Sequence, residues 1–259
     1  MRIQLYSDLH RERYARNRSL QNPMDDLPAL ESDIIVLAGD IDEGTEGMRW
    51  AAAQAEKLQK PVLYVPGNHE YYQHEYHALN GELVAFNKHS AVTCLVSDQF
   101  IYQGVRFLGA TFWTDFSAYN PELRQIVMKT LRDRVDDYEV IQYGDRILRP
   151  HDTLDIHRKE RDWLGQQLIQ TGDFDKTVVI THTGPSRKCQ NPSYPVGMAS
   201  SIFYSRLDHM VPMADLWLYG HTHANKDLDI GGTRLISNQH GYAGKQVCEG
   251  FEPNLVIEL

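Results

Sequence analysis

The strongest constraint on the fold is a short apolar strand that ends abruptly in a polar turn. Residues 61–65 (PVLYV) have the pattern of a buried strand, and residues 66–70 (PGNHE) follow directly. Gly67 allows the backbone to turn sharply where the strand ends. The turn then presents Asn68, an oxygen ligand, beside His69, an acid–base group. An ordinary polar loop looks the same, so this pattern gains weight only because it recurs.

Four other apolar strands also end in residues that can bind metals or transfer protons. They cover residues 2–6, 33–38, 177–180 and 215–219, and the polar residues after them are Asp8, His10, Asp40, Glu43, His182, His221 and His223. Residues two apart on an extended chain point to the same side, which suits the D-x-H and H-x-H pairs to a shared metal. Open α/β folds place their sites at the carboxyl edge of a parallel sheet. The sequence therefore predicts a site built from several strand ends.

The organisation of the chain favours a single α/β domain, 1–259, with one insertion. No linker, repeat or low-complexity tract divides its 259 residues. Residues 11–28 are polar and predict a surface loop. The strand–helix rhythm breaks at 111–150, where aromatic residues cluster before a helix with an apolar stripe. We expect 111–150 to be a cap beside the site; a lid, a dimer surface and packing on the core all stay open as its role.

The net charge limits the classes of binding partner, and the cysteines bear on whether the protein contains disulfides. The formal net charge of -9 argues against stable nucleic-acid binding and against an anionic membrane surface. It does not exclude a phosphorylated substrate, because bound cations can dominate a local site. The three cysteines are far apart and form no disulfide framework. With no apolar run long enough for a transmembrane segment and no signal peptide, we expect a cytoplasmic protein.

Taken in order, the strand ends resemble the signature of the calcineurin-like metallophosphoesterase superfamily. The matching blocks are D-x-H at 8–10, G-D-x-x-E at 39–43, G-N-H-E at 67–70, T-H-T-G-P at 181–185 and G-H-x-H at 220–223. They run through nearly the whole chain. The resemblance implies a four-layer α/β/β/α sandwich with two metal ions between the loops at the sheet ends.

The resemblance also implies a role for each residue. One divalent cation would be held by Asp8, His10 and His223, the second by Asn68, His182 and His221, and both by a bridging Asp40. His69 would lie beside the substrate without binding metal. Glu43 occupies the position of the acid that orients this histidine in the family, and the adjacent Asp42 competes for the role.

The donor types agree with these roles. Carboxylate, imidazole and amide ligands without thiolates suit Mn, our first expectation, or Fe, Zn, Co or Ni. A bridging carboxylate holds two cations about 3.5–4 Å apart, and water shared between them becomes a hydroxide that can attack phosphorus. His69 could then protonate the leaving oxygen. We therefore expect a dinuclear phosphoester hydrolase that forms no phosphoenzyme.

The subfamily is less constrained. Protein phosphatases of this superfamily carry an arginine where this chain has Pro66 and an arginine-glycine pair where it has Glu43-Gly44, which argues against that branch. The leading expectation is a phosphodiesterase or broad phosphatase for a phosphorylated small molecule. One alternative is a lipid-A-precursor pyrophosphatase. Such an enzyme needs an apolar, basic lid over its acylated substrate, and the 111–150 segment could supply that lid. Another is a non-catalytic scaffold, which the complete ligand set and His69 disfavour.

Overall fold

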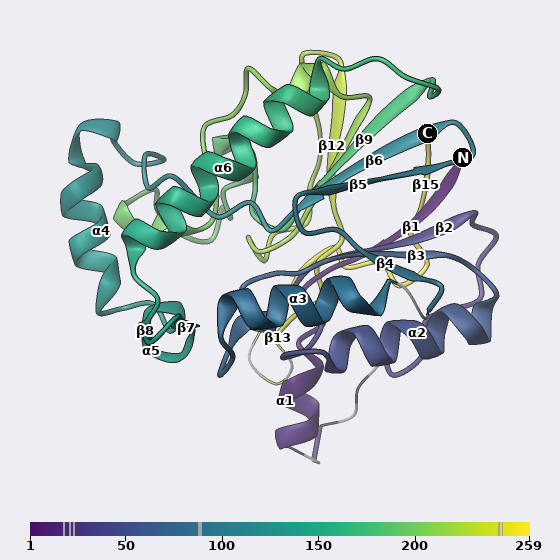
Figure 1. Cartoon of the computed structure of the whole chain (residues 1–259), viewed down its shortest axis with the longest axis horizontal. Coiled ribbons are helices and arrows are strands. Elements are labelled where there is room, and N and C mark those ends of the chain that lie inside the picture. The colour runs from purple at the N-terminus through teal and green to yellow at the C-terminus, as the bar shows by residue number, and fades with distance from the viewer. Residues whose placement is uncertain (18, 21, 23, 88–89, 243, 245) are drawn as a thin grey trace.

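A computed structural model describes the chain except for residues 18, 21, 23, 88, 89, 243 and 245 (Figure 1). The helices are α1 (Arg11–Arg16), α2 (Glu46–Leu58), α3 (Tyr76–Phe86), α4 (Arg124–Arg132), α5 (Asp137–Val140) and α6 (Pro150–Leu168). Short 3-10 turns are η1 (His69–Tyr71), η2 (Pro121–Leu123), η3 (Arg187–Cys189), η4 (Met198–Ile202) and η5 (Val211–Met213).

The strands form two large sheets and two small hairpins. The first sheet has the order β15-β1-β2-β3-β4, with β1 (Arg2–Tyr6), β2 (Ile34–Ala38), β3 (Val62–Val65), β4 (Val92–Cys94) and β15 (Val256–Glu258). The second has the order β11-β12-β10-β9-β6-β5, with β5 (Asp98–Tyr102), β6 (Val105–Ala110), β9 (Lys176–Thr181), β10 (Leu216–Tyr219), β11 (Asp227–Ile230) and β12 (Thr233–Ser237). The hairpins pair β7 (Gln142–Tyr143) with β8 (Arg146–Ile147) and β13 (Gly241–Tyr242) with β14 (Gln246–Val247).

Side-chain alternation along the strands separates three apolar cores. In β2, Ile35 and Leu37 pack toward α2 and α3, whereas Ile34 and Val36 pack toward the second sheet. Alternate residues of a strand face opposite sides of its sheet, so a fully apolar strand has to be covered on both sides. A third core lies between the second sheet and α6. Figure 1 shows the resulting order of helices, sheet, sheet and helix, which confirms the expected four-layer α/β/β/α sandwich.

The 111–150 segment forms η2, α4, α5 and the β7–β8 hairpin, to one side of the sheets in Figure 1. The apolar stripe of α4 is buried: Val127, Met128 and Leu131 join the same core as α2 and α3. The helix also packs against α6 and η4. Packing on the core therefore accounts for this stripe.

Helix α1 replaces the beginning of the surface loop expected for residues 11–28. Its first turn contains Glu12, which is buried. Apolar periodicity could not reveal this helix because it has only six residues and its inward side chain is a carboxylate. In the part of the chain that the structure describes, no helix is long and apolar enough to cross a bilayer.

The buried carboxyl group of Glu160 on α6 should make the stability of the fold depend on pH. Its carboxylate accepts the backbone N–H of Trp113 at 3.0 Å, and burial raises the pKa of Glu160 to about 8. Because this pKa is raised on folding, the carboxyl group stabilises the fold at pH values below its unfolded pKa. That contribution is lost as the pH rises through about 8. We expect Glu160→Gln to reduce the loss of thermal stability between pH 6 and pH 9. Circular dichroism melts of both proteins measure this loss, and equal losses would contradict the expectation.

Candidate metal centre

The loops after five parallel strands bring the predicted residues together. Asp8 and His10 follow β1, Asp40 follows β2, Asn68 and His69 follow β3, His182 follows β9, and His221 and His223 follow β10. Strands β1, β2 and β3 are adjacent and parallel, as are β9 and β10, so each set of loops leaves its sheet at one edge. The two edges face each other, and the site forms between them.

Five of these residues have a left-handed backbone conformation. The φ angles of Asp8, His10, Asp40, His221 and His223 lie between 45° and 67°. Such conformations cost of order 1–3 kcal/mol each for residues other than glycine, and they persist where the surrounding structure holds them. The backbone is therefore bent at these positions so that the side chains converge.

The first group of converging side chains is Asp8, His10 and His223. Oδ1 of Asp8 lies 3.3 Å from Nε2 of His223, which in turn lies 3.3 Å from Nε2 of His10. Asp8 and His10 are fully buried. One ligand atom from each residue falls within a 4.8 Å cluster, a compact N/O donor set for one cation.

The second group surrounds Nε2 of His182. This atom lies 3.1 Å from Nδ1 of His221, 3.3 Å from Oδ1 of Asn68 and 3.2 Å from Oδ1 of Asp40. Nδ1 of His182 lies 2.9 Å from the carbonyl oxygen of Ala38, which places the proton of the neutral ring on Nδ1. Nε2 is thereby left as the ligand atom.

Asp40 lies between the two groups. Its Oδ1 faces His182, and its Oδ2 is 3.8 Å from Nε2 of His10. The backbone N–H of His69 donates to Oδ1 at 2.9 Å. Burial would raise the pKa of Asp40, but the neighbouring imidazoles hold it well below its usual range. An ionised carboxylate in this place can bridge two cations.

The PGNHE turn owes its shape to Gly67 and Glu70. A Cβ at Gly67 would lie 2.2 Å from Oδ1 of Asp40, so only glycine permits the close approach of the two loops. Glu70 is fully buried and accepts the backbone N–H groups of Asp40 at 3.0 Å and Gly67 at 2.7 Å. The final residue of the motif therefore fastens the two loops to each other.

The charges of the cluster fit cationic occupants. Burial lowers the pKa of His182 and of His69, yet the nearby carboxylates raise these pKa values to about 10 and about 9. The charge of Asp40 is the largest single cause of this rise at both rings, and Glu12 adds to it at His69. The pocket thus favours positive charge, and its N/O donors without thiolates suit divalent transition metals. The residues present fit two such ions.

His69 lies beside the ligand groups and reaches the cavity. Its Nε2 is 4.0 Å from Oδ2 of Asp40 and 3.3 Å from the hydroxyl of Tyr242, and its ring stacks on Tyr72 with centroids 4.2 Å apart. His69 shares a donor cluster with His10 and Asp40. Its place at the cavity wall suits contact with a substrate.

The structure changes the partner expected for Glu43. Its carboxylate pairs with Arg16, at 2.5 Å, instead of lying on His69. The carboxylate that lies on His69 belongs to Glu12, with Oε1 3.3 Å from Nδ1. Asp42, the other candidate, faces Arg11 at 3.9 Å. The reason is local: α1 brings Glu12 inward and directs Arg16 at the loop that carries Glu43.

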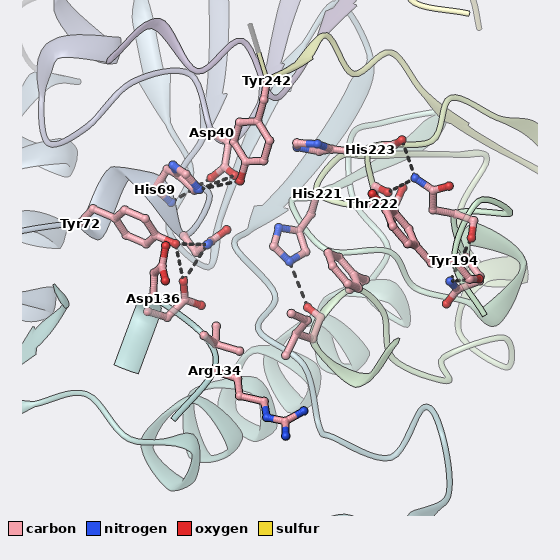
Figure 2. Close-up of a pocket in the computed structure, with 17 residues that line it drawn as sticks. Asp40, His69, Tyr72, Arg134, Asp136, Tyr194, His221, Thr222, His223 and Tyr242 are labelled. Carbon is pink, nitrogen blue, oxygen red and sulfur yellow. Dashed lines mark hydrogen bonds and ion pairs between the residues drawn. The ribbon is translucent and has the colours of Figure 1, made fainter. Parts of the chain in front are cut away.

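A cavity of about 300 Å³ opens over these residues. Figure 2 shows Asp40, His69, His221 and His223 facing it. The opposite wall comes from the 111–150 segment and from the region of η3 and η4, and its residues are Arg134, Val135, Asp136, Asp137, Gln190, Asn191, Tyr194, Ile202 and Phe203. The 111–150 segment therefore borders the site as well as packing on the core.

Asp137 is a site residue that sequence reasoning missed. It is buried, and its Oδ1 accepts the amide N–H of Asn68 at 2.8 Å and the hydroxyl of Tyr72 at 2.9 Å. Because an amide presents oxygen on one side and nitrogen on the other, this bond turns Oδ1 of Asn68 toward His182. No spacing rule could link residues 68 and 137.

We expect Asp137→Ala to weaken metal binding at the site of Asn68. The amide would lose the acceptor that fixes its orientation, and loss of such an outer partner typically lowers metal affinity 10–100-fold. Competition with a chelating dye measures the affinity of each site. Asp136→Ala is the matched control because Asp136 is its exposed neighbour. Equal affinities in the two variants would contradict the role of Asp137.

Comparison with known proteins agrees with this geometry. The family model described as calcineurin-like phosphoesterase matches residues 1–225. An uncharacterised protein, L509, of Acanthamoeba polyphaga mimivirus is 25% identical over 284 residues, which covers 100% of this chain and 97% of that protein. The range 1–225 that the family model matches contains every predicted metal ligand of this chain.

A solved structure shares the fold. Phosphopantetheinyl hydrolase (PptH) from Mycobacterium tuberculosis superposes with a TM-score of 0.73 at 18% identity, covering 93% of this chain and 89% of that one. At this identity the similarity concerns the fold alone.

Proposed function

We infer the function from one premise: this chain belongs to the calcineurin-like phosphoesterase family. It is accordingly a phosphoester hydrolase, which sets aside the scaffold alternative. We propose that it uses two divalent cations, with Mn²⁺ first, and that its substrates are phosphodiesters. The observation that carries the proposal is the placement of Asp40 between two sets of donors.

Each residue has a role in this proposal. Asp8, His10 and His223 would hold one cation, Asn68, His182 and His221 would hold the other, and Asp40 would contribute to both sets. When bound, the cations supply Lewis acidity toward phosphoryl oxygens and lower the pKa of water. His69, at the cavity wall, donates a proton from Nε2 to the leaving oxygen. The hydroxyl of Tyr242, 3.3 Å away, keeps Nε2 directed into the cavity.

The charge of the cavity supports a diester. A phosphomonoester is a dianion near neutral pH, whereas a diester carries a single negative charge. Among the described residues that line the cavity, Arg134 is the one Lys or Arg side chain, and Figure 2 shows its guanidinium directed away from Asp40 and His69. Cations bound in the cluster would then provide the main positive charge for substrate. A singly charged phosphoryl group needs less positive charge around it than a dianion does.

The shape of the cavity supports the same choice. The second ester group of a diester needs room beyond the phosphorus atom, and the whole cavity, with His69 and Phe203 among its lining residues, has a volume of about 300 Å³. A lipid-A-precursor pyrophosphatase would need an apolar lid surface instead. Val127, Met128 and Leu131 of α4 are buried in the core, and Ile126 is the one large apolar side chain of this helix that is exposed, which does not favour that alternative.

Hydrolysis of bis-p-nitrophenyl phosphate and p-nitrophenyl phosphate tests the proposal. The protein is stripped with a chelator and Mn²⁺ is restored. We expect kcat/KM for the diester to exceed that for the monoester by at least about tenfold, a difference of 1.4 kcal/mol in activation free energy. A preference for the monoester would replace the diesterase proposal with a phosphatase, and failure to hydrolyse either compound with metals bound would contradict both.

A further inference from the structure

One buried carboxylate serves two functional histidines. Oε1 of Glu12 lies 3.3 Å from Nδ1 of His10 and 3.3 Å from Nδ1 of His69. The two rings meet edge-on, with centroids 4.4 Å apart and an interplanar angle of 67°. In this arrangement both Nδ1 atoms lie close to the same oxygen. His10 belongs to a metal-ligand group, and His69 faces the cavity.

The surroundings leave the two rings dependent on Glu12. Nδ1 of His10, Nδ1 of His69 and Oε2 of Glu12 are all buried, and among the described residues none of these atoms meets full hydrogen-bond geometry with any partner. The ion-pair contacts at 3.3 Å with Oε1 of Glu12 are the polar contacts that the structure gives both Nδ1 atoms. Glu12 is 5% exposed, so solvent cannot replace it. An ionised carboxylate is costly to bury without partners, which fixes its place between the two imidazoles.

The contact of Glu12 with Nδ1 affects where Nε2, on the opposite edge of each ring, is directed. Nε2 of His10 lies 3.3 Å from Nε2 of His223, and Nε2 of His69 lies 3.3 Å from the hydroxyl of Tyr242. A ring that donates from Nδ1 presents its Nε2 on the far side. One carboxylate oxygen thus directs one Nε2 at a metal position and the other at the cavity.

The acid at the family's usual position is engaged elsewhere. Glu43 pairs with Arg16, four residues after Glu12 on α1. The six-residue helix therefore supplies the acid for the histidines and holds the alternative acid away from them.

We propose that Glu12 is a positioning residue that keeps Nδ1 of both His10 and His69 protonated, so that it orients a metal ligand and the proton donor together. The geometric part stands by itself, and the catalytic part rests on the proposed function of His69. Glu12 thereby takes the role that the family pattern gives to Glu43. The D-x-H motif becomes D-x-H-x-E in this chain, with residues 8, 10 and 12 acting together.

Nuclear magnetic resonance of histidine ring nitrogens tests this proposal directly. The Zn²⁺-loaded protein is labelled with ¹⁵N-histidine, and ring signals are assigned from single-histidine variants. We expect the Nδ1–H protons of His10 and His69 to be protected from exchange in the unaltered chain. In Glu12→Leu both signals should be lost or shifted. The Nδ1–H signal of His182, which is held by Ala38, serves as the internal control and should persist.

Two further variants complete the design. Glu12→Gln keeps the size and one acceptor oxygen, so it should retain the fold and shift both signals less than Glu12→Leu. Glu43→Gln should leave both signals in place. Zn²⁺ affinity in Glu12→Leu should fall about 10–100-fold, the usual effect of removing an outer partner of a ligand.

Opposite outcomes would overturn the proposal. Unchanged His10 and His69 signals in Glu12→Leu would exclude positioning by Glu12, and loss of the His69 signal in Glu43→Gln would return the role to Glu43. The ring signals do not depend on turnover. A protein inactive toward every ester would therefore refute the proposed function, while the signals would still show whether Glu12 positions the two histidines.

Discussion

Asp40→Asn is expected to release both metals and abolish turnover. The substitution keeps the size of the side chain and can keep the acceptor for the N–H of His69, so the fold should survive. It removes the negative charge that joins the two donor groups and leaves a neutral amide between them. Removing even an outer partner of a ligand costs 10–100-fold in affinity, so we expect a loss above about 100-fold here.

Elemental analysis after dialysis and hydrolysis of bis-p-nitrophenyl phosphate measure the two effects. Asp227→Asn provides the matched control, since Asp227 pairs with Arg234 on the surface. Retention of two metals per chain by Asp40→Asn would contradict the bridging role.

His69→Ala is expected to separate rate from metal binding. His69 lies outside the two donor sets that Asp40 joins, so both cations should stay bound. The variant loses the Nε2 that faces the cavity, and loss of a general acid lowers rates by about 10²–10⁴-fold. We expect the fall in kcat with little change in KM, because the proton transfer occurs in the transition state.

Metal content and steady-state kinetics on both nitrophenyl esters measure this separation. The exposed His209 offers a matched His→Ala control far along the chain from the motif residues. An unchanged kcat on both esters would remove the acid role of His69.

The layers and most of the site could be predicted from the sequence because they depend on local patterns. A fully apolar strand such as β2 has to be covered on both faces, which leads to a layered α/β fold. Parallel strands align their carboxyl ends, so residues after β1, β2 and β3 had to converge at one edge. The D-x-H and H-x-H spacings then identified which side chains meet.

The remaining site residues depend on contacts that no local pattern encodes. Asp137 reaches Asn68 across 69 positions of sequence, from a segment whose role the sequence left open. Glu12 left a weak signal, since it continues the two-residue spacing of Asp8 and His10. That spacing was obscured by the polar character of residues 11–28. The left-handed backbone at Asp40 and His221 follows from tertiary packing, because neither residue type requires it.

The central claim, that one pair of cations held by Asp40 and its neighbours performs phosphoester hydrolysis, has a direct test. Chelator-stripped protein is titrated with Mn²⁺, and bound metal and bis-p-nitrophenyl phosphate hydrolysis are measured in the same samples. We predict no hydrolysis without metal, and activity that rises with occupancy and saturates at two Mn²⁺ per chain. Hydrolysis by the stripped protein, or full activity at one bound metal, would contradict the claim.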